Sequence, residues 1–245
     1  MRTICRHFPL FIAALLAGSA LSGPAHAALK TFRFEGITNT NTSDAAIGED
    51  QLFVDVFDNA SDPLWDDTLN KLATGHVGFR FRNTGPLDSS ICDIYFEDGT
   101  LVSSMDGTIR ASLGVKFTQG ASPGNLPGGG GVGFKATPGF VADSAPPVQP
   151  NGVNPNEWVI ISFELEPGLS YDHVIAALAK RPAKAGSGSL RIGIHVQGFA
   201  GGGSESFVNL PDPVPEPVPE PATVLLWGGL SLLGACGAFR RRLPE

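Results

Sequence analysis

The acidic run Asp55–Asp67 is the densest group of side chains in the sequence that could bind a ligand. It reads DVFDNASDPLWDD and holds five carboxylates, at Asp55, Asp58, Asp62, Asp66 and Asp67. Calcium takes roughly six to eight oxygen ligands, so carboxylates gathered in one loop make a candidate calcium site. The spacing does not follow the EF-hand pattern, and a solvated acidic loop is the alternative interpretation.

The serines and histidines of the chain show no catalytic spacing. Ser204 and Ser206 lie in the glycine-rich stretch GGGSESF, where turn hydrogen bonds are the simpler role, and no G-x-S-x-G elbow occurs. Outside the N-terminal segment the histidines are isolated along the chain, at His76, His173 and His195. We therefore expect a protein that is not an enzyme and needs no cofactor apart from the candidate calcium.

Two other chemistries stay open as alternatives. Glu164 and Glu166 flank Leu165 and point to the same side of a strand. A glycoside hydrolase needs two carboxylates about 5–9 Å apart in a cleft, which many surface acids also satisfy. Aromatic rings that stack on sugar faces would instead make a carbohydrate-binding module, and the candidates are Trp65, Tyr95 and Trp158.

The cysteines exclude an intramolecular disulfide in the central part of the chain. Cys5 and Cys236 lie in the two terminal segments, so Cys92 is alone between them. It alternates with Ile94 and Phe96 on one strand face, which predicts a buried free thiol. No Cys/His cluster of the zinc type is present.

The elements that would position these residues are strands. Period-two alternation of apolar and polar residues recurs in seven stretches: 31–36, 52–58, 76–83, 91–104, 111–117, 158–165 and 190–199. In 76–83, for example, Val77, Phe79 and Phe81 alternate with Arg80 and Arg82. Such strands, separated by Gly, Pro, Asn and Asp turns, predict an all-β fold, an antiparallel β-sandwich or jelly roll.

The remaining signals are local. Asp98-Gly99 predicts a two-residue hairpin. Residues 172–181, with Asp172 as the cap and Pro182 as the stop, predict one short helix, and a brief helical turn fits Leu64–Leu72. The stretch 118–157 is dense in Gly and Pro, which predicts a long functional or mobile loop with a short strand at Val132–Lys135.

The N-terminal 27 residues have the three parts of a secretory signal peptide. Two arginines precede an apolar stretch of about a dozen residues, and Ala25-His26-Ala27 is a small-x-small cleavage site with cutting expected before Ala28. The predicted ectodomain is 28–210, a length that favours one domain with one core.

The C-terminal end combines a spacer, an apolar stretch and a basic cluster. Residues 211–221 carry closely spaced prolines, which favour an extended chain. Residues 222–239 are uncharged, and as a helix they would span roughly 27 Å, enough for one transmembrane crossing. Residues 240–245 follow, and their cluster Arg240, Arg241 and Arg242 would stay cytoplasmic.

Together, these C-terminal parts resemble the PEP-CTERM sorting signal of Gram-negative bacteria. The matching stretch is VPEPATVLLWGGLSLLGACGAFRRR, and its motif falls on Val218, Pro219, Glu220 and Pro221. The resemblance implies an exosortase as partner, a membrane-embedded enzyme that cleaves near the motif. The stretches 151–165 and 190–209 also resemble a recurring ectodomain of PEP-CTERM proteins, which carries no established activity. A plain membrane anchor is the alternative.

Charge excludes one class of partner. The whole chain has 24 acids and 17 Lys plus Arg, a net charge of −7. Without the terminal segments, which hold five arginines and Glu245, 23 acids face 12 bases. Nucleic acids need clustered Lys and Arg for their phosphates, so we expect no nucleic-acid partner.

The sequence thus predicts an exported protein that is anchored briefly in the inner membrane and then reaches the cell surface or the medium. Its expected role is a structural or interaction protein in exopolysaccharide or biofilm. A carbohydrate-binding module is the alternative. The extracellular polysaccharide is then a further expected partner.

Overall fold

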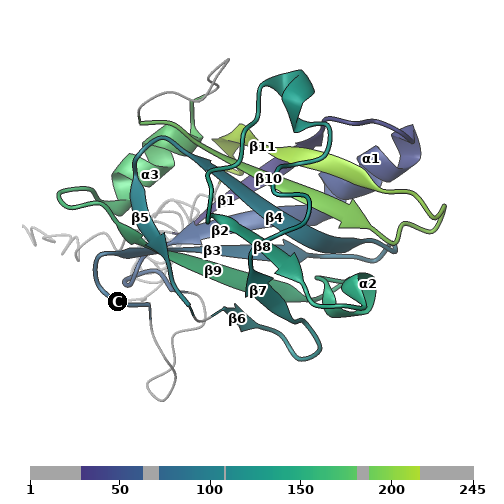
Figure 1. The fold of residues 1–245 in the computed structure, drawn as a ribbon, viewed down its shortest axis with the longest axis horizontal. Coiled ribbons are helices and arrows are strands. Elements are labelled where there is room, and N and C mark those ends of the chain that lie inside the picture. The colour runs from purple at the N-terminus through teal and green to yellow at the C-terminus, as the bar shows by residue number, and fades with distance from the viewer. Residues whose placement is uncertain (1–28, 63–71, 108, 181–187, 216–245) are drawn as a thin grey trace, which may run out of the picture.

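The computed structural model describes residues 29–62, 72–107, 109–180 and 188–215. The ordering of its elements, shown in Figure 1, is β1 (Lys30–Gly36), α1 (Thr42–Gln51), β2 (Leu52–Phe57), β3 (His76–Asn83), β4 (Ser90–Asp98), β5 (Val102–Met105), β6 (Arg110–Ala111), β7 (Phe117–Gln119), a 3-10 helix (Gly129–Val132), β8 (Val141–Ser144), α2 (Val148–Asn151), β9 (Trp158–Leu165), α3 (Tyr171–Leu178), β10 (Leu190–Gln197) and β11 (Glu205–Pro213). The predicted β-rich class is confirmed.

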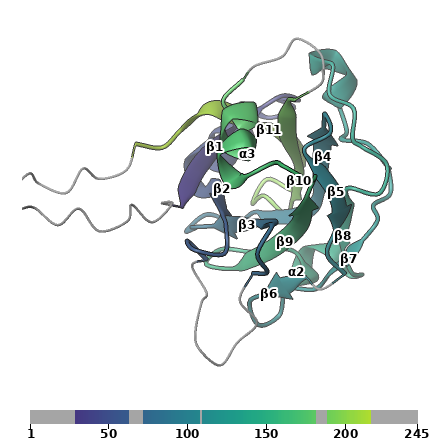
Figure 2. The same cartoon turned by 90° about the vertical axis from the view of Figure 1, so that its left-hand side faces the viewer.

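The strands form one antiparallel sheet that curls on itself, as the end-on view in Figure 2 shows. Their order is β5-β9-β3-β2-β1-β11-β10-β4-β8-β7, and β6 also pairs with β9. The two halves face each other across the core, where the Phe96 ring of β4 lies 5.0 Å from Phe79 of β3 and 4.7 Å from Phe163 of β9. The predicted two-sheet sandwich is thus replaced by a single curled sheet, because β1 and β11 join the halves by continuous pairing.

Strand β11, which joins the halves, was not expected from the sequence. Prolines disfavour a central strand because they lack an N–H. Here β11 pairs with β10 only through residues 205–208, ahead of Pro211 and Pro213. Asn209 Oδ1 accepts the Ile192 N–H at 2.8 Å in place of a backbone carbonyl. The sheet therefore runs three residues past the predicted domain boundary at 210.

The hairpin predicted at Asp98-Gly99 does not form. β4 pairs with β10 and β8, whereas β5 pairs with β9 on the other half of the sheet. The Asp98 carboxylate accepts the backbone N–H groups of Thr100, Leu101 and Val102 at 3.0–3.4 Å. Asp98 therefore caps a turn that carries the chain from one half of the sheet to the other. The predicted turn at Asp98-Gly99 is confirmed, whereas the predicted pairing of the two flanking strands is wrong.

The strand predicted at 111–117 is split in two. β6 pairs with β9 and β7 pairs with β8, so the chain crosses between the halves here too. Leu113, which alternates with Val115 and Phe117 in the sequence and would share their buried face in one continuous strand, is 99% exposed at the turn between β6 and β7. Gly114 has a φ of 101° in that turn, a conformation that favours glycine.

The glycine- and proline-rich stretch 118–157 is ordered against the outer face of β4 and β10. It contains β8 and α2, and the strand predicted at Val132–Lys135 is replaced by the 3-10 helix and the turn that ends it. Leu126 and Phe134 from this stretch bury Tyr95 completely. This burial removes Tyr95 from the candidate sugar-stacking residues.

The helices differ from the single helix that was expected. α3 matches the prediction, although Ser170 and His173, which form a capping box, replace Asp172 as its cap. α1 was missed because it has no apolar stripe. It packs at Gly48, where a Cβ atom would lie 2.1 Å from the Phe207 ring. In Figure 1, α1 and α2 lie at one end of the molecule and α3 at the other.

Several predicted features lie outside the described residues. They are the signal peptide with Ala25, Ala27 and Ala28, most of the Leu64–Leu72 turn, the sorting motif Val218, Pro219, Glu220 and Pro221, the apolar segment 222–239, and the cluster Arg240, Arg241 and Arg242. Within the described residues, no helix has the length and apolar character needed to cross a bilayer.

Candidate functional site

Asp55, the first residue of the acidic run, is fully buried on the outer face of β2 and is bound by arginines. Its Oδ2 accepts from Arg80 Nε at 2.9 Å, Arg80 Nη2 at 2.6 Å and Arg82 Nε at 2.9 Å. Its Oδ1 accepts the Thr31 hydroxyl at 2.7 Å. Both carboxylate oxygens are therefore occupied by protein donors.

The other described acids of the run also have donors of their own. Asp58 Oδ1 accepts the backbone N–H groups of Ala60 and Ser61 at 3.0 and 2.9 Å, which closes a turn. Asp62 Oδ2 accepts the Leu72 N–H and Arg110 Nη1, both at 3.0 Å. Asp66 and Asp67 lie outside the described residues, among which no cluster of acids, histidines or cysteines is placed to hold a metal ion. The calcium site stays a prediction.

The candidate nucleophiles and bases are placed for structure. His195 Nδ1 lies 3.1 Å from Ser206 Oγ, but Ser206 has no exposed surface for a substrate to reach. His173 belongs to the α3 capping box, and His76 Nε2 lies 3.3 Å from Asp106. Glu164 is exposed and lies 3.4 Å from the Ser104 hydroxyl.

A pair of acids on the outer face of β4 and β8 was not identified in the sequence. Asp93 lies directly opposite Asp143 in the ladder and is 5% exposed. Burial, followed by the negative charge of Asp143, raises the pKa of Asp93 to about 7. Cys92, next to it, is buried and free as predicted, and burial raises the pKa of its thiol to about 11.

The most ligand-like surface is a row of alternating cations and aromatic rings across β1, β2, β3 and β9. Register places Arg33 opposite Phe53, Phe53 opposite Arg82, and Arg82 opposite Trp158. The guanidinium carbon of Arg82 lies 4.6 Å from the Phe53 ring centre, and that of Arg33 lies 5.5 Å from it. With strands about 4.8 Å apart, the row spans roughly 14 Å. We call it the Arg–aromatic row.

A hollow of about 330 Å³ opens at the β3–β9 end of this row. The residues that line it come from β3, β9 and the chain next to them: Arg80, Arg82, Asn83, Thr84, Asn156, Glu157 and Trp158. Nε of Arg82 is bound to Asp55, whereas its Nη1 and Nη2 make no hydrogen bond to any described residue. We call this hollow the Arg82 pocket.

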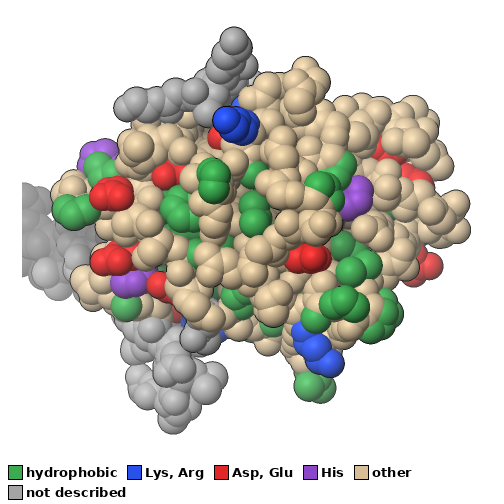
Figure 3. All heavy atoms as spheres, in the orientation of Figure 1, with side chains coloured by type: hydrophobic (Ala, Val, Ile, Leu, Met, Phe, Trp, Pro, Cys, Tyr) green, Lys and Arg blue, Asp and Glu red, His purple; other side chains and the backbone are tan. Residues whose placement is uncertain are grey.

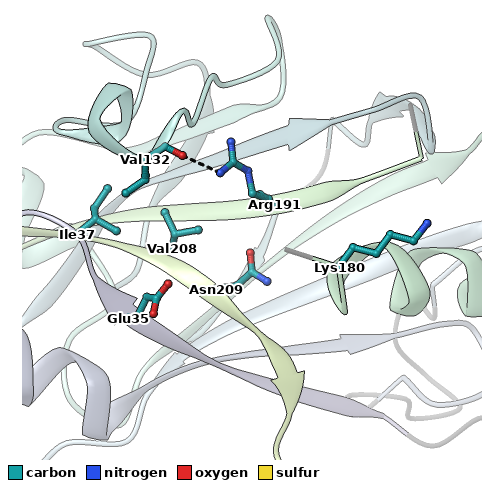
Figure 4. Close-up of a pocket in the computed structure, with 7 residues that line it drawn as sticks. All are labelled: Glu35, Ile37, Val132, Lys180, Arg191, Val208 and Asn209. Carbon is teal, nitrogen blue, oxygen red and sulfur yellow. Dashed lines mark hydrogen bonds between the residues drawn. The ribbon is translucent and has the colours of Figure 1, made fainter. Parts of the chain in front are cut away.

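A second hollow, of about 200 Å³, lies beside β11 and is shown in Figure 4. Ile37, Val132 and Val208 supply its apolar part. Arg191 is its buried cation, but all its nitrogens are committed: Nε bonds Glu97 at 2.6 Å, and Nη1 and Nη2 bond the carbonyls of Val132 and Gly133 at 3.1 and 2.6 Å. This arginine therefore holds the 3-10 helix against the sheet, and each of its three nitrogens already has a partner in the fold.

A third hollow, of about 230 Å³, is lined by residues that are close in sequence to those of the Arg82 pocket. Its lining includes Ser89 and Ser90 at the start of β4, Gln149 of α2, and Asn154 and Pro155 in the segment that precedes β9. Because the segment that precedes β9 also lines the Arg82 pocket, the two hollows share one end of the sheet. Loops gathered at the end of a β scaffold are a usual place for binding sites.

Of the aromatic candidates from the sequence, Trp158 alone is placed at a pocket among the described residues. It is half-buried, while Trp65 lies outside the described residues. The outward position of Arg80 and Arg82 was readable from the alternation in β3, but the contributions of Asn156 and Glu157 were not. On the face drawn in Figure 3, Lys and Arg side chains are isolated among scattered acids.

No protein-family model, curated protein or solved structure matches the chain.

Proposed function

We propose that this chain is an exported protein of the cell surface or extracellular matrix, and that its β-rich domain binds polysaccharide at the Arg82 pocket. The observation that carries the proposal is the pocket itself. It combines a half-buried tryptophan, two arginines and an exposed asparagine in one hollow. An aromatic wall with a few convergent polar groups is typical of sites for small polar ligands.

Delivery is the second part of the proposal and rests on the sequence. The N-terminal signal directs export, the apolar segment 222–239 holds the precursor in the inner membrane, and an exosortase cleaves near Val218–Pro221. The domain then acts as a structural or interaction protein in the exopolysaccharide.

The strand directions locate the end of β11 relative to the Arg82 pocket. The Arg82 pocket lies where β3 ends and where β2 and β9 begin. β1 begins and β11 ends toward the other end of the strands, where the Val214 N–H donates to the Thr31 carbonyl at 2.7 Å. β11 therefore runs away from the pocket end of the sheet, and at Val214 it lies level, through Thr31 and Asp55, with Arg80 of β3.

Binding of the full chain, purified in mild detergent, to dextran, cellulose oligomers and alginate tests the proposal. Affinity electrophoresis should show retardation by at least one polymer. Trp158→Ala should weaken that retardation by roughly tenfold or more. A nucleotide base stacked on an aromatic side chain, which is a contact of similar area, is worth about 1–3 kcal/mol. Val132→Ala, which shortens an exposed apolar side chain at the hollow beside β11, is the control and should leave the retardation unchanged. Absence of retardation by all three polymers would overturn the binding function.

A further inference from the structure

We infer that the Arg82 pocket recognises the carboxylate of an acidic sugar, such as a uronate unit of a polysaccharide. This inference rests on the proposed polysaccharide-binding function and names the class of sugar. Its basis is the state of the Arg82 guanidinium.

The Arg82 side chain is held in place before any ligand arrives. Asp55 Oδ2 fixes its Nε at 2.9 Å, and the Phe53 ring lies against its guanidinium at 4.6 Å. Asp55 is itself held by Arg80 and by the Thr31 hydroxyl. A cation that is already ordered loses little conformational entropy when it binds, which favours affinity.

The donors that stay unused have the geometry of a carboxylate site. Nη1 and Nη2 of Arg82 carry N–H groups without partners among the described residues, and the side chain is 30% exposed at the pocket. A guanidinium edge donates two parallel hydrogen bonds to a carboxylate, a pairing stronger and more directional than bonds to neutral hydroxyls. A neutral sugar would leave this pairing unused.

The local charge also favours an anion. The pocket lining contains the guanidinium groups of Arg80 and Arg82 and the carboxylate of Glu157; Arg33 lies at the other end of the row, and Asp55 is buried behind Arg80 and Arg82. The local excess is one positive charge, on a chain whose net charge is −7. Glu157 is directed to the Asn154 backbone N–H at 2.8 Å and its side-chain amide at 2.9 Å. One of its carboxylate oxygens, Oε2, is therefore already engaged by protein donors.

The other walls suit a sugar ring more than a bare inorganic anion. Trp158 offers a flat apolar surface across from Arg82. Asn156 is exposed, and its side-chain amide makes no hydrogen bond to the described chain, so it can pair with sugar hydroxyls. Asn156 also has a φ of 69°, a conformation that asparagine tolerates better than most residues.

The test compares alginate oligomers with the same oligomers after reduction of their carboxyl groups. Calorimetry on the full chain in mild detergent should show binding of the acidic form at least tenfold tighter than that of the neutral form. Arg82→Gln should reduce affinity for the acidic form by roughly 10- to 100-fold, since a hydrogen bond to a charged group is worth about 1.5–3 kcal/mol. Its effect on the neutral form should be several-fold smaller. Lys135→Gln, which removes an exposed cation elsewhere, should change neither.

The outcomes separate this inference from the function on which it rests. Equal affinity for both forms would overturn the acidic-sugar inference while keeping polysaccharide binding. Failure of both forms, together with failure of every polymer named above, would overturn the binding function itself. If urea titration shows that Arg82→Gln does not fold, Arg82→Lys takes its place. Lysine keeps the positive charge but lacks the two parallel N–H donors, so the affinity for the acidic oligomer should still fall. Full retention of that affinity would count against the inference. Sulfate that competes at the same concentration as the oligomer would show an inorganic anion site only and overturn it.

Discussion

Replacing Asp93 by asparagine should stabilise the protein at alkaline pH and have no effect at acidic pH. Asp93 is 5% exposed and faces Asp143 across the β4–β8 ladder, and no described cation pairs with it. Burial and the Asp143 charge raise its pKa from the ordinary 3.8 to about 7. The folded protein therefore holds a proton on Asp93 that the unfolded chain has already released.

The sign of the effect follows from this difference in bound protons. A carboxyl with a raised folded-state pKa makes the free energy of unfolding fall as pH rises from 3.8 to about 7. One pKa unit corresponds to about 1.4 kcal/mol, so the full loss is about 4 kcal/mol, reached above pH 7. Asparagine keeps the shape and removes the charge, so this loss should be absent from Asp93→Asn.

Urea unfolding between pH 4 and pH 8.5 measures the effect as a difference between variant and parent. The gap should be near zero at pH 4 and grow to several kcal/mol at pH 8, with Asp93→Asn the more stable protein. Asp88→Asn, at an exposed position, should show no such gap. A gap that does not change with pH, or an Asp93→Asn variant less stable than the parent at pH 8, would show that the anion has a partner and would refute the reasoning.

Three shorter predictions concern packing, the thiol and the sorting motif. Gly78→Ala should destabilise the protein by about 1–3 kcal/mol in urea unfolding because its Cβ would lie 2.3 Å from the Phe57 ring, whereas Gly107→Ala, with open space around it, should not. Cys92 should fail to react with a thiol reagent at pH 8 in the folded protein and react at once in urea, since burial raises its pKa to about 11; prompt reaction of the folded protein would contradict that burial. Replacement of Pro219–Pro221 by alanines should leave full-length protein in the inner membrane on immunoblots, and normal processing of that variant would defeat the sorting assignment.

The strands that the sequence revealed are those whose apolar residues alternate along the chain, although β4, β9 and β10 are buried on both faces. β3 is the clearest example, with Val77, Phe79 and Phe81 inside and Arg80 and Arg82 outside. β2 shows the limit of the pattern, because Asp55 and Phe57 on its outer face are also fully buried. Burial of that face depends on arginines from β3 and on contacts of Phe57 with Leu72 and Ile160, which no alternation in β2 encodes.

The elements that were missed depend on contacts between distant parts of the chain. β11 contains prolines and follows a glycine-rich stretch, so its local signals favour a loop, and its pairing with β1 decides otherwise. α1 has no apolar stripe and is held by a close approach to Phe207. The Arg82 pocket has the same origin: Arg82 was visible as an outward residue, but the register that sets it between Phe53 and Trp158 is a property of the assembled sheet.

The position of β11 bears on how the domain could be released from a membrane. The strand is paired with β1 up to Pro213, and the motif begins at Val218, five residues later. Five residues span at most about 18 Å when fully extended. A cut at the proposed motif would therefore fall outside the sheet and leave all of its strand pairing intact. The same short distance would require the cleaving enzyme to work close to the end of β11.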